Sequence, residues 1–179
     1  MTSILIQIYN LSLSIGYFPT ELKSATMILI PKSPLNLHDI KNYRPISLLD
    51  VHAKILDKII NKRFTTRLNE LNLMNPRQHG FRKDYGTHTA IATINETISR
   101  DVRNGHKVDL VLRDVTKAFD KVWHSGLKFK LTQIDLHDCM KRTICNFLMN
   151  RTAMIRIDHT TGPKSVSYTH LTLPTNREV

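Results

Sequence analysis

The chain has 179 residues, 41% of them hydrophobic, so it is long enough for one domain with a buried core, or for a domain and part of another. Lys and Arg (26) outnumber Asp and Glu (15), and this excess is spread along the sequence, which suits a long polyanion such as nucleic acid better than one small acidic ligand. Its two cysteines, Cys139 and Cys145, fit neither a disulfide framework nor a CxxC metal knuckle and indicate a reducing, intracellular compartment.

Apolar residues at helical spacing predict a first helix, which Gly16 and Pro19 end: Ile4, Leu5, Ile8, Leu11 and Ile15. Gln7 and Asn10 interrupt this segment and no positive charge precedes it, so we expect neither a signal peptide nor a membrane span. Residues 25–31, ATMILIP, predict a short strand that proline ends.

The clearest predicted helix covers residues 51–73, where one wide apolar stripe comprises Val51, Ile55, Leu56, Ile59, Ile60, Phe64, Leu68 and Leu71. A row of basic residues lies mostly off that stripe: Lys54, Lys58, Lys62 and Arg63. Such a row is usually a solvated helix face, and a contact with nucleic acid is the alternative.

A basic, turn-rich segment, PRQHGFRKDYG, separates this helix from a second one at about 88–103, which the Asn-Gly pair at 104–105 ends. Val108, Leu110, Leu112 and Asp114 then alternate with other residues and predict a strand that carries these four on one face. A helix at about 138–150 and a strand at 153–158 follow. Because the order shows no regular βαβ alternation, we favour an α+β fold with helices against an antiparallel sheet.

Asp114 stands at the end of the apolar run LVLRD. A buried carboxylate without a partner is costly, so this position needs a cation, which a basic side chain or a magnesium ion could supply. Asp120 is poorly placed to share that ion, because six residues of strand span roughly 20 Å and six residues of helix lead to a different face. A two-metal site would therefore need another carboxylate near Asp114 in space.

Four ordered segments of the chain carry distinctive motifs, among them QHGFRKDYGTHTAI and LVLRDVTKAFDKVWH. Together the four resemble segments of the reverse transcriptases of non-LTR retrotransposons, including the jockey type. LVLRDVTKAFDKVWH resembles the motif with the first catalytic aspartate, and QHGFRKDYGTHTAI resembles the glutamine-glycine-phenylalanine box. IPKSPLNLHDIKNYRPISLLDVHAKILDKIINKR resembles the fingers segment, and FLMNRTAMIRI resembles the helix and strand that enter the next motif. The resemblance implies helix-rich fingers at 1–106 and, at 107–164, a partial polymerase palm with an antiparallel sheet.

Carried over by position, the resemblance implies that Asp114 is a catalytic metal ligand with the Val115 carbonyl beside it. Phe119 would lie under the sugar of the incoming nucleotide and disfavour a 2′-hydroxyl; without the family it would be a core aromatic. Arg44 would contact the triphosphate through its planar fork of donors, with Lys32 adding charge nearby. The alternative for Lys32 is a solvated strand end.

Gln78, Gly80, Phe81 and Arg82 match the box expected near the template strand. There a glycine permits close approach of the backbone, and the aromatic ring and guanidinium can stack or neutralise phosphate. The implied partners are an RNA template, a DNA primer and deoxynucleoside triphosphates, and the implied cofactor is Mg²⁺ in a two-metal site. The family also implies action in the nucleus.

The chain departs from the family pattern at Arg113, where an apolar residue is common, and after Ile157. The family would continue with a glycine-glutamine-glycine box and a tyrosine-x-aspartate-aspartate hairpin, but no two aspartates are adjacent anywhere in this chain. We therefore expect a polymerase fragment that is inactive alone, with a non-catalytic basic nucleic-acid-binding module as the alternative. Residues 165–179 are expected to lie outside the family pattern, either as a product of translated sequencing adapter or as a short terminal strand.

Overall fold

The computed structural model describes residues 2–35, 37–115, 118 and 121–166. Its elements are α1 (Thr2–Ile15), η1 (Thr20–Lys23), β1 (Ser24–Pro31), η2 (Ile40–Asn42), β2 (Tyr43–Leu49), α2 (Val51–Glu70), α3 (Thr87–Arg103), α4 (His124–Gln133), α5 (Asp138–Phe147), β3 (Thr152–Ile157), β4 (Thr160–Thr161) and β5 (Ser165–Val166). The α+β class is confirmed, and α1, α2, α3, α5, β1 and β3 form where the sequence predicts them.

The chain divides into two compact units. The first is built from Met1–Thr65 and Lys117–Leu173, and the second mainly from Thr66–Thr116. The first unit therefore holds the sheet and most of the helices, whereas the second holds α3 and the irregular segments on either side of it.

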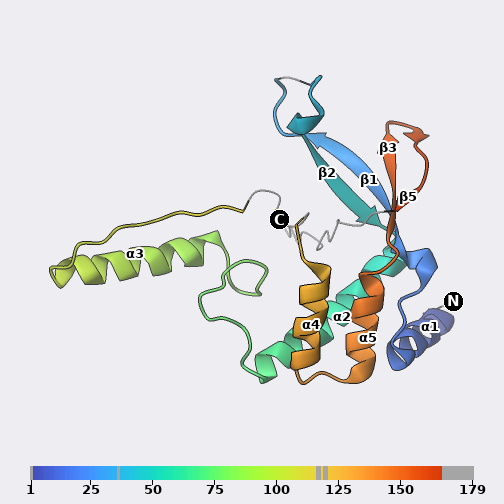
Figure 1. The fold of residues 1–179 in the computed structure, drawn as a ribbon, viewed down its shortest axis with the longest axis horizontal. Coiled ribbons are helices and arrows are strands. Elements are labelled where there is room, and N and C mark those ends of the chain that lie inside the picture. Colours follow the sequence, from blue (N-terminus) through green and yellow to red (C-terminus); the bar gives the residue numbers. More distant parts are fainter. Residues whose placement is uncertain (1, 36, 116–117, 119–120, 167–179) are drawn as a thin grey trace. The chain divides into compact units, whose positions relative to one another are not determined.

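The sheet of the first unit is mixed. Its strands follow the order β2-β1-β3-β4, and β5 also pairs with β3 (Figure 1). The pairs β1–β2, β3–β4 and β3–β5 are antiparallel as expected, but β1 and β3 run parallel. The short connection between β3 and β4 dictates an antiparallel pair, whereas the long connection from β1 to β3 leaves the direction to tertiary packing.

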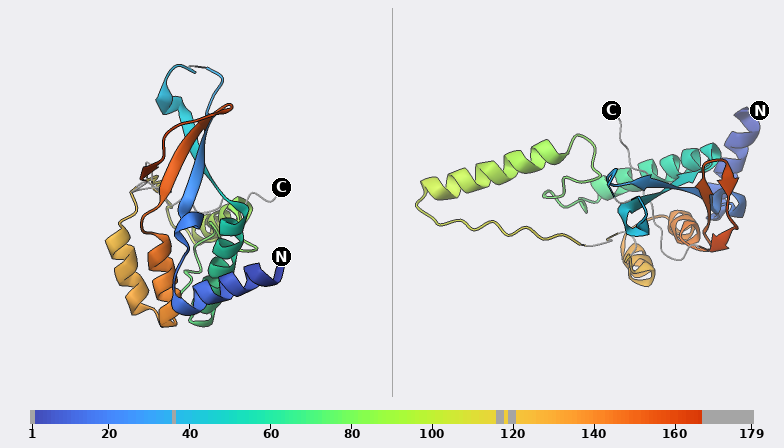
Figure 2. Two further views of the ribbon diagram at one scale, coloured as in Figure 1. Left: turned by 90° about the vertical axis from the view of Figure 1, so that its right-hand side faces the viewer. Right: turned by 90° about the horizontal axis from the view of Figure 1, so that it is seen from above.

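The core of the first unit lies where α1, α2 and α5 meet, at one end of the sheet (Figures 1 and 2). Its buried members are Tyr9, Leu13, Phe18, Leu56 and Ile60, with Met140, Ile144 and Phe147 packed against them. Gly16, with φ +76°, ends α1 in the left-handed region that glycine tolerates best. This turn directs Phe18 into the core, where its backbone N–H donates to Asn146 Oδ1 at 2.9 Å.

Helix α2 buries a narrower face than its apolar pattern suggests. Ala53, Leu56 and Ile60 are buried, but Val51 is 64% exposed and Ile55 is exposed as well. The predicted wide stripe is therefore wrong for Val51 and Ile55, whereas its other members are buried or half-buried. The side of α2 that carries Val51 and Ile55 is not covered by another element of the described chain, so these side chains stay in contact with solvent.

The strand predicted around 108–114 is wrong for this chain. Residues 106–115 form neither helix nor strand, and their apolar side chains are exposed except for the half-buried Val108, with Leu112 exposed to 82%. Alternation predicts which side chains would share a face, but a strand also needs a hydrogen-bonded neighbour. No described strand pairs with this segment, which instead runs back in the opposite direction to α3 (Figure 1).

The sequence reasoning also missed α4, whose apolar periodicity is weak. Trp123 precedes this helix, and Gly126 in its first turn leaves room for the indole, because a Cβ at this glycine would collide with the Trp123 ring.

Among the described residues, none of the helices combines the length and apolarity that crossing a membrane requires.

Candidate functional site

Two cations predicted as site residues meet on the β1–β2 hairpin. Arg44 lies opposite Ile30 in the antiparallel register, and Lys32 follows two residues after Ile30. Lys32 lies one residue past the end of β1, but its backbone N–H donates to the Asn42 carbonyl at 2.7 Å, so the pairing continues to it and places Lys32 diagonally from Arg44 on the same face of the hairpin. Both are exposed, and in the described part of the chain neither has an acidic partner. The hairpin thus presents two uncompensated positive charges together.

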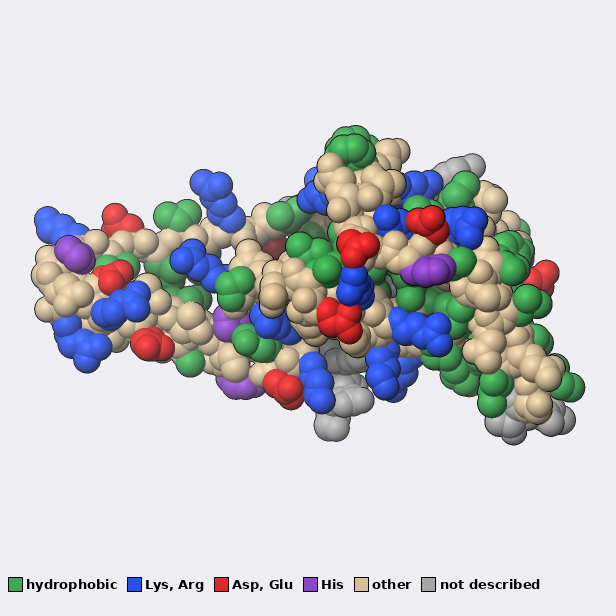
Figure 3. Space-filling view, turned by 90° about the horizontal axis from the view of Figure 1, so that it is seen from below, with side chains coloured by type: hydrophobic (Ala, Val, Ile, Leu, Met, Phe, Trp, Pro, Cys, Tyr) green, Lys and Arg blue, Asp and Glu red, His purple; other side chains and the backbone are tan. Residues whose placement is uncertain are grey.

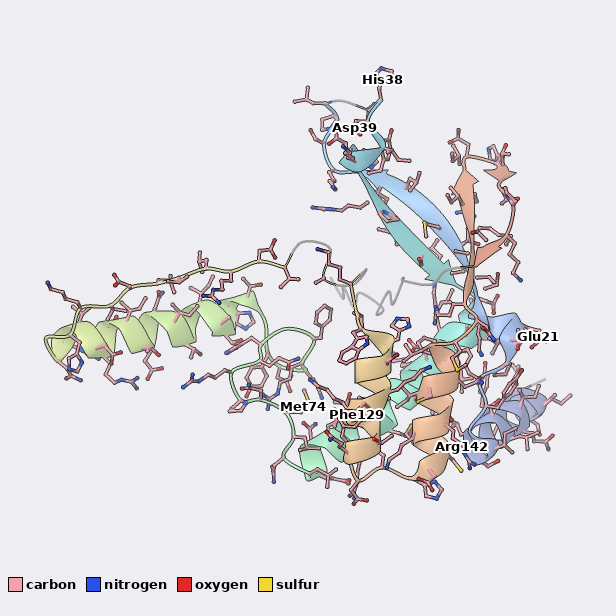
Figure 4. The ribbon with its side chains drawn as sticks, viewed as in Figure 1. Glu21, His38, Asp39, Met74, Phe129 and Arg142 are labelled. Atoms are coloured by element: carbon pink, nitrogen blue, oxygen red, sulfur yellow. The ribbon has the colours of Figure 1, made fainter. Side chains whose placement is uncertain are left out.

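The connection beyond these cations is held in shape by its own hydrogen bonds. Tyr43 donates its hydroxyl to the Leu37 carbonyl at 2.9 Å, and Lys32 donates from Nζ to the Lys41 carbonyl at 2.8 Å. Asp39, labelled at the hairpin tip in Figure 4, accepts from the Lys41 amide and caps η2. Lys32 is therefore a structural group of this loop as well as a surface cation.

The box at 78–82 lies in the second unit, in a loop organised by Asn75. The side-chain Oδ1 of Asn75 accepts from the Arg77 backbone amide at 2.9 Å. The backbone carbonyl of Asn75 accepts from the Gln78 backbone amide at 3.0 Å and from Arg82 Nη1 at 3.3 Å. Gln78 in turn donates from Nε2 to the Gly80 carbonyl at 3.3 Å. The structure therefore brings the four predicted box residues into one ordered loop.

Three residues that the sequence reasoning did not single out position this loop. The Arg82 guanidinium lies over the Tyr85 ring at 4.2 Å, and that ring meets His79 edge-on, with centroids 5.3 Å apart. His79 Nδ1 lies 2.8 Å from the Thr89 hydroxyl on α3. The sequence signal that could have identified them is the spacing of His79 and Tyr85, each three residues from Arg82. Tyr85 restricts where the Arg82 fork can point.

Phe81 and Gly80 form the exposed tip of the same loop. Phe81 is 70% exposed and has φ +57°, an uncommon conformation for a bulky residue that often occurs at functional positions. A Cβ built on Gly80 would meet no atom within 4 Å. The chain itself thus gives no steric reason for glycine at this position, which leaves the backbone open to a partner.

Asp114 lies in the second unit, on the extended segment 106–115. Its carboxylate is exposed and makes no ion pair or hydrogen bond with other described residues, and the neighbouring Val115 is 65% exposed. Among the described residues no group of three or more His, Cys, Asp or Glu side chains could hold a metal ion. Asp114 alone therefore does not make a metal site. Phe119 and Asp120 lie outside the described residues.

The buried charges of the first unit lie elsewhere, where the parallel strands β1 and β3 begin. Lys23 and Arg151 each precede the first residue of a strand, and both are buried. Burial lowers the pKa of Arg151, while the carboxylate of Asp57 opposes that shift. Burial also raises the pKa of Asp57 and lowers that of Lys23. Arg151 lies 4.3 Å over the Phe147 ring. We assign these groups to the packing of α2 against the sheet.

Positive charge is also distributed beyond these residues. Figure 3 shows Lys and Arg side chains spread over the face in view, with fewer Asp and Glu side chains among them. A surface of this kind attracts polyanions at long range and supports weak binding that does not depend on sequence.

Comparison with known proteins identifies relatives. The family model for reverse transcriptase (RNA-dependent DNA polymerase) matches residues 30–175. The RNA-directed DNA polymerase from mobile element jockey of Drosophila melanogaster is 31% identical over 151 residues, which is 84% of this chain and 16% of that protein. The Pol polyprotein from a type-1 R2 retrotransposable element of Popillia japonica is 28% identical over 150 residues, 84% of this chain and 20% of that protein. The chain thus spans a fifth or less of these relatives.

Proposed function

The chain belongs to the reverse transcriptase family, and from this premise we propose that it supplies the fingers and the first part of the palm of an RNA-directed DNA polymerase from a non-LTR retrotransposon. The observation that carries the proposal is the placement of Arg44 on the β1–β2 hairpin and of Lys32 one residue past β1 on the same face. Two adjacent cations without acidic partners suit a triphosphate, and an arginine adds bidentate geometry.

The loop at 75–89 supports contact with the template. Arg82, held over Tyr85, would neutralise a phosphate, and the exposed Phe81 ring would stack on a base. The open space at Gly80 would admit the template strand close to the backbone. Gln78 would keep its hydrogen bond to the Gly80 carbonyl. Replacing Gly80 by alanine should therefore leave folding unchanged and weaken template binding.

The catalytic part of the proposal concerns Asp114. Reverse transcriptases use Mg²⁺, and we assign Asp114 and the Val115 carbonyl to that metal, with Phe119 facing the nucleotide sugar. One carboxylate does not hold the two metal ions of phosphoryl-transfer enzymes. The remaining metal ligands must therefore come from outside the described residues. We therefore expect the 179-residue chain to show no primer extension alone.

A chimera tests the proposal. The segment of the jockey polymerase that matches this chain is replaced by this chain, and primer extension on an RNA template is measured with Mg²⁺. Asp114→Asn should reduce the rate by about a hundredfold or more, because a metal ligand stabilises transition-state charge by several kcal/mol. Asp109→Asn, an exposed carboxylate five residues earlier, is the matched control and should leave the rate unchanged.

Two results would contradict the assignment. A folded chimera without any extension activity would mean that this chain does not supply working fingers and palm. An active chimera in which Asp114→Asn behaves like Asp109→Asn would remove Asp114 from the catalytic site.

The second candidate function is a basic module that binds nucleic acid without catalysis, favoured by the formal charge of +11 and its wide distribution. This function predicts salt-sensitive binding of RNA or DNA that is indifferent to Mg²⁺ and to Asp114→Asn. Fluorescence anisotropy of the isolated chain measures both properties. A Mg²⁺-dependent effect that disappears with Asp114→Asn would rule this candidate out.

A further inference from the structure

Helix α2 carries three lysines on the face opposite its buried side. Lys54, Lys58 and Lys62 follow at intervals of four residues, and all three are exposed. At about 100° per residue, their mean direction is about 165° from that of the buried Ala53, Leu56 and Ile60. They therefore form one row, inclined to the helix axis by about 40° of rotation per step and directed away from the core, which we call the α2 lysine row.

No acidic side chain neutralises this row in the described part of the chain. Asp57 is half-buried on another side of α2, and Glu70 at its C-terminal end pairs with Arg67 at 3.1 Å. Asp50, just before the helix, accepts from the His52 amide at 2.9 Å and makes no ion pair with the row. Exposed helical lysines are commonly balanced by a carboxylate four residues away. Asp50 stands four residues before Lys54 without pairing with it, and Lys58 and Lys62 have no carboxylate at that spacing.

The row matches a phosphate backbone in length. Lysines four residues apart are separated by about 6 Å along the helix axis, so the row spans about 12 Å. A nucleic-acid strand presents a phosphate about every 3.4 Å of duplex axis, which places three or four phosphates beside the row. Each lysine is a compact point charge on a flexible stem, suited to phosphates and not to the reading of base edges.

We propose that the α2 lysine row binds the phosphate backbone of a nucleic-acid strand without reading its sequence. This proposal rests on the proposed function for its partner and adds a contact surface outside the hairpin and the 75–89 loop. An acidic protein surface fits less well, because the row lacks the aromatic or arginine anchors of protein interfaces. A membrane surface fits less well too, because Val51 and Ile55 are the only large apolar side chains exposed on the described part of α2.

The test measures binding of the 179-residue chain to a fluorescein-labelled single-stranded RNA and to an RNA–DNA hybrid over a series of salt concentrations. The row variant combines Lys54→Gln, Lys58→Gln and Lys62→Gln. The matched control combines Arg103→Gln, Lys130→Gln and Lys164→Gln, three exposed cations on separate parts of the chain. Each variant lowers the formal charge from +11 by three, to +8.

For the row variant, we expect the slope of log K against log salt to fall in magnitude by about 2 to 3, because each lost phosphate contact removes about 0.7 to 0.9. For the control variant, the magnitude of this slope should fall by less than about 1, because scattered charges act only through the general electrostatic field of the protein. Replacing the three lysines by arginine should preserve the wild-type slope, and unchanged circular dichroism would show that the fold is intact.

Equal slopes for the row variant and the control would overturn this inference alone, because wild-type binding would still agree with the polymerase assignment. If polyglutamate displaced the labelled RNA as well as unlabelled RNA does at equal charge concentration, the partner would be an acidic protein. If the row were needed for binding to vesicles containing phosphatidylserine but not to RNA, the partner would be a membrane. A wild-type chain that binds neither RNA nor hybrid would overturn the inference together with the nucleic-acid part of the proposed function.

Discussion

Phe18→Ala should destabilise the first unit by about 4 kcal/mol. The Phe18 side chain is 0% exposed and meets the Phe147 ring edge-on, with centroids 4.9 Å apart and an interplanar angle of 61°. Removal of a buried phenylalanine typically costs about 3 to 5 kcal/mol, of which an aromatic pair supplies about 0.5 to 1.5 kcal/mol. Since whole domains are stable by about 5 to 15 kcal/mol, this loss is a large fraction of the total.

Urea unfolding followed by far-UV circular dichroism measures the effect. Phe129→Ala is the matched control, because Phe129, labelled on α4 in Figure 4, is 63% exposed and its removal should change stability by less than about 0.5 kcal/mol. A double-mutant cycle with Phe147→Leu isolates the ring contact, with an expected coupling of about 0.5 to 1.5 kcal/mol. A loss below about 1.5 kcal/mol for Phe18→Ala, or one equal to that of Phe129→Ala, would refute the assignment of Phe18 to the core.

Three other outcomes can be measured. Gly16→Ala should lower stability by about 1 to 2 kcal/mol or more in the same urea assay, because φ is +76° and the new Cβ would lie 2.7 Å from Arg142 Cβ; an unchanged midpoint would contradict this. Burial lowers the pKa of Lys23, so the folded state binds fewer protons than the unfolded state between that lowered value and the ordinary 10.5. Its contribution to the unfolding free energy therefore rises with pH in this window, and Lys23→Met should remove that rise in melts recorded across alkaline pH. Tyr85→Leu should weaken RNA binding about as much as Arg82→Gln does, with little further loss in the double variant, whereas Tyr85→Phe should keep wild-type affinity; additive losses would show that the ring does not position the guanidinium.

The candidate site illustrates how far residue patterns extend. Asp114 could be named from its place after an apolar run, and Arg44 and the box around Gly80 from their resemblance to family motifs, because each of these motifs is contiguous in the sequence. Tyr85 was missed, since its role depends on lying beneath Arg82, a contact that spacing along the chain does not reveal. The proximity of Lys32 and Arg44 likewise depends on the register of two strands.

The sequence alone determined the local structure of this protein. Helices α1, α2, α3 and α5 form where apolar residues recur every three or four positions, and α1 and α3 are followed by Gly16 and Gly105 with φ of +76° and +79°. These features depend on interactions between residues close in the chain, which a linear pattern contains. Only the tertiary structure decided that β1 and β3 run parallel, that Val51 stays exposed, and that the apolar segment before Asp114 pairs with none of the described strands. Each of these outcomes depends on hydrogen bonds or packing between distant segments, and periodicity within one segment does not specify which distant segment will supply them.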